Sequence, residues 1–333
     1  MIVLFTVLIL PVILLNGWSS ASGAITGCVS ARFLSPDAAA RLAAACTFAG
    51  AVLMPLINPG VAWTIYGIAD FGEDSTAALS ALCAGLCAVI VWSLVAFRFG
   101  IPNSETHALI SGMTGAALAR SMTLDAVNFR EWGLVLSGFL LSSLLSFLAA
   151  FAANNILLFF FSGRNRRRGT QRFRLTQSFS AASGAALHGA QDCQKFMGVY
   201  MLGLSLWHPE VSADTDAVPF PVILICASVM TLGTLLGSQN VIKKLGCDMT
   251  TMDAAACSAA SGSSSAVMAL CTFLGLPASF TQSKACAIMG TGMCKSGGNN
   301  LRVVGQILGA WCLSFPVCGA IGFLFSFMVS HPR

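Results

Sequence analysis

The chain has 333 residues, of which 56% are hydrophobic and only 9% are charged, and its net charge is +5. Soluble domains carry about 25% charged residues, so this composition excludes an ordinary soluble protein. It indicates a polytopic membrane protein built from apolar helices of about 20 residues. The positive charge is concentrated in an arginine-rich block at residues 164–174. Such a block is typical of a cytoplasmic loop, and it does not indicate nucleic-acid binding.

The 13 cysteines are an odd number, and they are scattered through apolar runs without the spacing of a metal site. We interpret them as small buried residues and not as a disulfide framework. Residues 1–15 are apolar and contain no lysine or arginine. A cleaved signal peptide needs a basic start, so this segment is predicted to be the first membrane helix.

In chain order, long apolar runs predict membrane helices in both halves, and a further span contains the polar stretch around His188. The predicted spans cover residues 2–15, 38–57, 77–97, 132–161, 220–237, 254–275 and 301–329. Two shorter helices, at residues 105–119 and from residue 280 to near Lys295, are expected to be half-membrane or re-entrant. The polar, glycine-containing patch at residues 17–24 predicts that the first helix is interrupted.

The two halves resemble a repeat. Pro-x-Ser-x-Thr occurs at residues 102–106 and again at residues 277–281, and small polar patches open both halves. If each half crosses the membrane an odd number of times, about five, the second half is inverted. With the arginine block inside, Arg98 also lies inside, and the acidic loops and both termini lie outside, which fits the positive-inside rule.

We therefore predict an all-α, polytopic helical bundle built from two inverted repeats with interrupted or re-entrant helices. Residues 1–161 form the first repeat and residues 175–333 the second. Residues 162–174 form a basic cytoplasmic linker between them.

Ionisable side chains in this apolar sequence mark a candidate site, because they are costly at membrane depth. Transporters of this architecture bind substrate near the midplane, where interrupted helices meet. Four segments are expected to meet there: residues 17–24, 104–107, 188–195 and 279–284. Helix starts with serine and threonine hydroxyls suit an oxyanion.

The charged residues in these segments suit the binding of both an anion and a cation that are transported together. Lys195 and Lys284 can neutralise an anion, whereas Asp192 and Glu105 can bind a cation or a proton. A structural ion pair between Glu105 and Lys284 is an alternative.

Purely structural roles for these residues are also alternatives. Ser104 and Ser279 can serve simply as helix caps. His107 can make a purely structural hydrogen bond. The polar residues near His188 can lie at a helix end in the membrane interface, and Lys295 and Arg302 can be ordinary loop charges.

Residues 188–198 read HGAQDCQKFMG and are similar to the HGANDxQKxMG motif of the PiT family of inorganic phosphate transporters. Residues 102–107 (PNSETH) and 277–282 (PASFTQ) resemble the paired PVSTTH motifs of that family. The order and spacing of these motifs match over nearly the whole chain. The resemblance implies secondary transport of phosphate, coupled to Na⁺ or H⁺, through two inverted repeats.

The resemblance also implies roles for single residues. The expected substrate-binding residues are Ser104, Thr106, Gln191, Lys195, Ser279 and Thr281. The expected cation-coupling residues are Asp192, Glu105, Gln194, Ser19 and Ser20, with Asp192 as a candidate Na⁺ ligand. No cofactor is expected besides the coupling ion.

The first-half motif of the family, GANDxANA, is altered here to GWSSASGA at residues 17–24. Ser19, Ser20 and Gly23 stand where Asn, Asp and Asn are expected, so one carboxylate of a symmetric pair is absent. Glu105, which replaces a threonine, can restore that charge and shift coupling toward protons. Phe280 also replaces a threonine and Gln282 a histidine.

We therefore expect a multi-pass symporter of the plasma membrane, not an enzyme, with inorganic phosphate, a coupling cation and the lipid bilayer as partners. Nucleic acid is not an expected partner, and a homodimer is a candidate assembly. The alternatives are transport of another oxyanion such as sulfate, a degenerate homologue that does not transport, and an intramembrane enzyme using His188 and Asp192. No ATP-binding P-loop is present in the sequence, so an ion gradient is the expected driving force.

Overall fold

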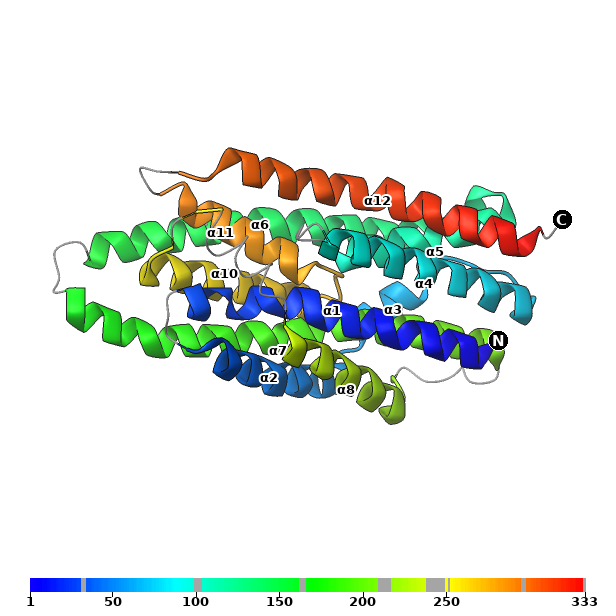
Figure 1. Ribbon diagram of the computed structural model, residues 1–333, viewed down its shortest axis with the longest axis horizontal. Coiled ribbons are helices and arrows are strands. Elements are labelled where there is room, and N and C mark those ends of the chain that lie inside the picture. Colours follow the sequence, from blue (N-terminus) through cyan, green and yellow to red (C-terminus); the bar gives the residue numbers. More distant parts are fainter. Residues whose placement is uncertain are drawn as a thin grey trace.

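The computed structural model describes residues 1–30, 34–98, 104–161, 166–208, 217–237, 249–250, 252–294 and 298–331. Its elements are α1 (Ile2–Ser30), α2 (Pro36–Ile57), α3 (Gly60–Tyr66), α4 (Ser75–Arg98), α5 (Glu105–Ser121), η1 (Leu124–Ala126), α6 (Phe129–Phe161), α7 (Arg166–Trp207), α8 (Phe220–Leu236), α10 (Ala254–Phe273), α11 (Phe280–Gly292) and α12 (Leu301–Ser330). Figure 1 shows the long helices extending along the molecule, with both chain ends at one end. We call this the terminal end, and the opposite end, where α6 ends and α7 begins, the basic end.

Six of the described helices are long and apolar enough to cross a membrane: α1, α2, α4, α6, α10 and α12. The bounds of the last five lie close to the predicted spans, because continuous apolar runs leave a helix as the stable solution in lipid, whereas α1 extends to Ser30, well beyond the predicted end at residue 15. The short elements α3 and η1 were not predicted. Lys243, Lys244 and Lys295, and most of the second acidic loop, lie outside the described residues.

α4 and α5 form a hairpin that opens toward the terminal end. The start of α4, the end of α5 and the end of α12 line one pocket there, through Thr76, Ser121 and Ser330. Arg98 ends α4 at the inner tip of this hairpin, where its neighbour Phe97 packs on Trp18 with ring centroids 4.2 Å apart. Trp18 lies in the middle of α1, so the prediction that Arg98 belongs to an inner loop is wrong.

α10 and α11 form the matching hairpin at the basic end. The amide of Asn300, which precedes α12, donates to the Met249 carbonyl ahead of α10 at 2.9 Å. The Asn299 side chain donates to the carbonyl of Met289, near the end of α11, at 2.8 Å. The start of α10 and the end of α11 are therefore held together, and the two hairpins enter the molecule from opposite ends (Figure 1).

The hairpins change the expected number of crossings. Each returns to the end from which it started, so about five crossings in each half is too many. α1, α6, α7 and α12 extend along most of the molecule, whereas α2 and the 17-residue α8 each cover only part of its length (Figure 1). The hairpin of each half enters from the opposite end to the other, so the second half is inverted relative to the first, as predicted.

Neither polar patch interrupts its helix, so the prediction of a broken first helix is wrong. α1 continues through residues 17–24 to Ser30, and α7 continues through residues 188–198. Glycine in these patches permits close helix packing: Gly17 lies against the backbone of α8, and Gly189 lies against the backbone of α2, with no room for a Cβ at either position. Most of the predicted basic linker at residues 162–174 lies in the first turns of α7, which begins at Arg166.

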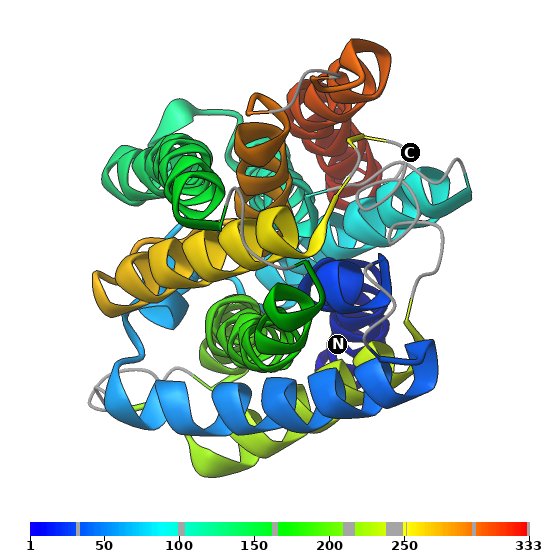
Figure 2. The ribbon, with the colours of Figure 1, turned by 90° about the vertical axis from the view of Figure 1, so that its left-hand side faces the viewer.

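Seen along its length, the molecule has two groups of helices (Figure 2). α1, α2, α7 and α8 pack together on one side, and α5, α6, α11 and α12 pack on the other. The outer hairpin arms lie between the groups: α4 contacts α1 as well as α5 and α12, and α10 contacts α7 as well as α6 and α11. The tips of both hairpins are thus placed at the contact between the groups.

Candidate functional site

Ser104 and Ser279 each cap the helix at the tip of a hairpin. Ser104 Oγ accepts from the amide of His107, and Ser279 Oγ accepts from the amide of Gln282, both at 3.4 Å. Both serines have extended backbone with φ −98°, as an N-cap residue does. The free amide groups of each first turn therefore lie at the tip of its hairpin, where a helix start attracts negative charge.

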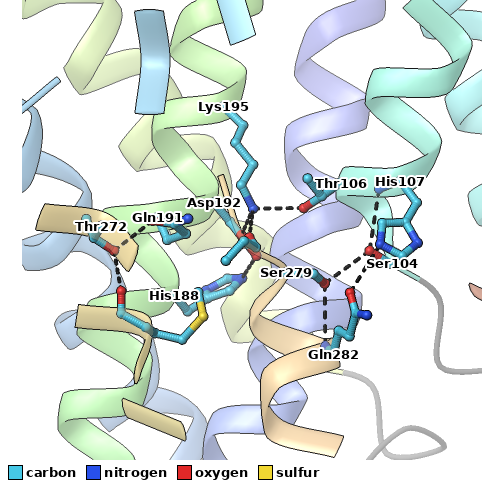
Figure 3. Close-up of polar contacts among 12 residues, drawn as sticks. Ser104, Thr106, His107, His188, Gln191, Asp192, Lys195, Thr272, Ser279 and Gln282 are labelled. Carbon is cyan, nitrogen blue, oxygen red and sulfur yellow. Dashed lines mark hydrogen bonds and ion pairs between the residues drawn. The ribbon is translucent and has the colours of Figure 1, made fainter. Parts of the chain in front are cut away.

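The two caps are in direct contact, which the sequence analysis predicted only as proximity. Ser104 Oγ donates to Ser279 Oγ at 3.0 Å. His107 Nε2 lies 3.1 Å from Gln282 Oε1, and both pairs are separated by 175 positions in the chain. Equivalent residues of the two repeats thus meet across a pseudo-twofold axis, deep inside the protein (Figure 3).

Lys195 connects α7 to both hairpin tips through one ammonium group. Its Nζ donates to Asp192 Oδ1 at 2.5 Å, to Thr106 Oγ1 at 2.8 Å and to the carbonyl of Ala278 (Figure 3). Both charged side chains are almost completely buried. The other carboxylate oxygen, Asp192 Oδ2, lies 3.5 Å from His188 Nε2. All three ammonium protons have acceptors, so the lysine is held at the point where the two tips meet.

Glu105 forms a second polar cluster beside the tips. Its carboxylate accepts from Ser19 of α1 at 3.2 Å and from Ser93 of α4 at 2.5 Å. The alternative of an ion pair with Lys284 is wrong, because Lys284 Nζ instead donates to Ser261 at 2.6 Å. Glu105 thus lies beside the altered first-half motif. Ser93 was not predicted; it is one of two serines, with Ser80, in the apolar run 77–97.

The remaining predicted residues differ in their contacts. Gln191 braces α10: its amide donates to the Leu276 carbonyl at 2.8 Å and accepts from Thr272 at 2.7 Å. Ser20 and Thr281 are buried in the same region. Gln194 is fully buried, and neither of its amide atoms has a hydrogen-bond partner among the described residues. The structure does not bring Gln194 to the Asp192 cluster.

The arrangement can hold an anion and a cation close together. Two opposed helix starts, two hydroxyls and the Lys195 ammonium are donors that suit an oxyanion. Asp192 and Glu105 supply negative charge at the edge of the same region. Across the described residues there is no group of three His, Cys, Asp or Glu side chains that could hold a metal ion. Any cation bound here therefore depends on single carboxylates with hydroxyl or carbonyl oxygens.

This fold defines a class: multi-pass α-helical membrane transporters made of two inverted repeats. The sequence pattern described as Phosphate transporter family (PHO4) matches residues 16–168 and 161–322. The chain belongs to this family of transporters, and it is an integral protein of the plasma membrane.

Individual relatives agree with this assignment. A probable low-affinity inorganic phosphate transporter of Bacillus subtilis is 28% identical over 95% of this chain and 93% of its own length. A protein of the same description from Mycobacterium tuberculosis is 31% identical over 92% of this chain and 72% of its own length. The solved structure titled "The sodium-dependent phosphate transporter" has the same fold, with a TM-score of 0.86 over 98% of each chain and 20% identity.

Proposed function

We propose that this protein carries inorganic phosphate across the plasma membrane together with a cation. The observation that carries the proposal is the contact of Ser104 with Ser279 beside the buried Lys195. A phosphate between the tips would receive hydroxyl and backbone donors from both repeats. It would also have a lysine within reach that is now bonded to Thr106 and Asp192. Thr281 and the first-turn amides are further candidate donors.

The charges of the buried region support co-transport of a cation. Among the described residues at the tips, Asp192 and Lys195 neutralise each other in their ordinary ionisation states, and Glu105 beside them is negative, so no surplus positive charge is left there to neutralise an anion. A phosphate adds at least one negative charge, and an unbalanced charge is costly at membrane depth. A cation that travels with the phosphate removes this cost. The relatives named as phosphate transporters support phosphate, rather than sulfate, as the anion.

We propose a proton carried by Glu105 as the coupling ion. Each Asp192 oxygen already has a nitrogen neighbour, Lys195 or His188, which disfavours Na⁺ there. Glu105 has two hydroxyl neighbours, Ser19 and Ser93, which can hydrogen-bond either its charged or its protonated form. Na⁺ coupling remains the second candidate because the structural relative is titled sodium-dependent.

Uptake into liposomes that contain the purified protein tests both the coupling ion and the substrate. Labelled phosphate uptake should follow an imposed pH gradient and should not respond to a Na⁺ gradient alone. Glu105→Gln should remove the pH response. Uptake that follows Na⁺ and ignores pH would overturn the proton proposal but not phosphate transport. Equal competition by sulfate, or no uptake and no phosphate binding by folded protein, would overturn the substrate proposal.

The assembly of the protein as a homodimer stays a prediction.

A further inference from the structure

Lys284 is a buried cation that the proposed transport site does not use. It lies in α11 with 2% of its surface exposed, and its Nζ donates to Ser261 Oγ at 2.6 Å. Among the described residues no carboxylate lies within ion-pair distance of this ammonium, because both ion pairs found there involve Asp192. A buried ammonium whose acceptor is one neutral hydroxyl is an unbalanced charge, and an anion would balance it.

Phe280 separates Lys284 from the hairpin tips. Its ring is buried and packs edge-on against His188, with centroids 5.5 Å apart. Gly23 of α1 and Gly184 of α7 face the same ring, and the stem of Lys284 lies beside the ring at Gly23. Lys284 lies one turn after Phe280 on α11, which runs from the hairpin tip toward the basic end. It therefore lies on the side of Phe280 that faces the basic end.

Hydroxyl groups lie on both sides of this point, nearer the tips on α10 and nearer the basic end on α7. Ser265, one turn after Ser261 on α10, is buried, and its Oγ has no hydrogen-bond partner among the described residues. It lies beside Gly184 and Phe280. Ser265 also lines a groove of about 610 Å³ between α7 and α10, together with Thr176, Ser180 and Ser183. Polar groups thus extend from Phe280 along the contact between α7 and α10.

We propose that Lys284, Ser261 and Ser265 form a second anion-binding station, on the cytoplasmic side of Phe280, which receives phosphate as it leaves the tips. The proposal rests on the proposed function, because the ligand is the transported anion. Lys284 supplies the charge, and the two hydroxyls supply donors. The station lacks the opposed helix starts of the main site, so it binds phosphate more weakly and lets it leave.

The test compares the two faces of the membrane. The apparent KM for labelled phosphate is measured in intact cells, from outside, and in inverted membrane vesicles, from the cytoplasmic side. Lys284→Met should raise the cytoplasmic KM about tenfold or more and leave the outer KM unchanged, because it removes a charge-assisted hydrogen bond. Lys284→Arg should retain most of the cytoplasmic affinity. Ser264→Ala is the matched control, since that hydroxyl bonds only its own helix, at the Ser261 carbonyl.

The outcomes separate this proposal from the proposed function. An unchanged cytoplasmic KM in folded Lys284→Met overturns the station, and an equal rise on both faces assigns Lys284 to the main site instead. If Lys284→Met does not fold, Ser265→Ala replaces it, with a rise of about threefold expected on the cytoplasmic face alone; no rise overturns the station. A parent protein that moves no phosphate from either face overturns the proposed function itself.

Discussion

At the scale of single residues, Lys195 decides the local geometry. One ammonium group is bonded to Asp192 on its own helix, to Thr106 of the first hairpin and to the backbone of Ala278 in the second. Arrival of an anion between the tips would compete with these acceptors for the same protons. Binding of an anion would therefore change the hydrogen bonds of Lys195 and, through this side chain, affect α7.

The ion pair of Lys195 and Asp192 gives a prediction with two readouts. Asp192→Asn should abolish coupled uptake and lower the free energy of unfolding by about 3–5 kcal/mol, because it leaves a buried ammonium without its counter-charge. Adding Lys195→Met should restore much of the stability but not the uptake. Thermal unfolding in detergent and liposome uptake measure the two effects. Full uptake by Asp192→Asn would show that this carboxylate lies outside the transport site.

Sequence reasoning identified the residues of the contact region but not their partners. Ser104, Thr106, Asp192, Lys195 and Ser279 were predicted, and the structure brings them together. Helix geometry explains why Gln194 is absent from this cluster. Residues two apart on a helix do not face each other, so Gln194 lies away from Asp192. The pairing of Gln191 with α10 depends on a contact across 81 positions, which no local pattern reveals.

At the scale of elements, small residues set the distance between helices. Gly189 of α7 lies against the carbonyl of Thr47 in α2, and Gly17 of α1 lies against the carbonyl of Met230 in α8. Without side chains at these positions, the backbones approach closely and gain packing energy that lipid cannot supply. The glycines that suggested broken helices therefore have a packing role. Periodicity and composition alone do not distinguish these two uses of glycine.

Two glycine variants separate packing from helix propensity. Gly189→Ala should destabilise the protein by about 1–3 kcal/mol, because the new Cβ would overlap the backbone of α2. Gly305→Ala in α12 is the control: a Cβ there meets no atom within 4 Å, so the variant should be neutral or stabilised by about 0.5–1 kcal/mol. Thermal unfolding of both variants is the measurement. Equal behaviour of the two would contradict close packing at Gly189.

At the scale of the whole molecule, the two hairpins enter from opposite ends and touch at their tips. The inverted repeat was predictable from two short motifs and the distribution of basic residues. The short arms α5 and α11 were predicted as half-membrane or re-entrant helices, but the return of α4 and α10 was not, because a helix of 24 residues such as α4 has the length and composition of a full crossing. Only its packing beside α5 shows that it turns back inside the protein.

A crosslink between the tips tests whether they move during transport. In the double variant Ser104→Cys, Ser279→Cys, mild oxidation should join the tips, since the parent hydroxyl oxygens are 3.0 Å apart. Uptake should fall in proportion to the crosslinked fraction and return after reduction, because alternating access has to separate the groups of helices. Both single variants and the oxidised parent, with its 13 cysteines, are the controls. Undiminished uptake by crosslinked protein would mean that the tips stay together throughout the cycle.

The continuity of α7 has a mechanical consequence. A helix of 42 residues is about 63 Å long at 1.5 Å per residue, roughly twice the thickness of the hydrocarbon layer. It carries Asp192 and Lys195 on an unbroken rod that has no joint near the motif. We therefore expect α7 to stay straight during transport. The movements that open the site to one face or the other should occur in the hairpins and in the proline-containing helices α1, α2 and α12.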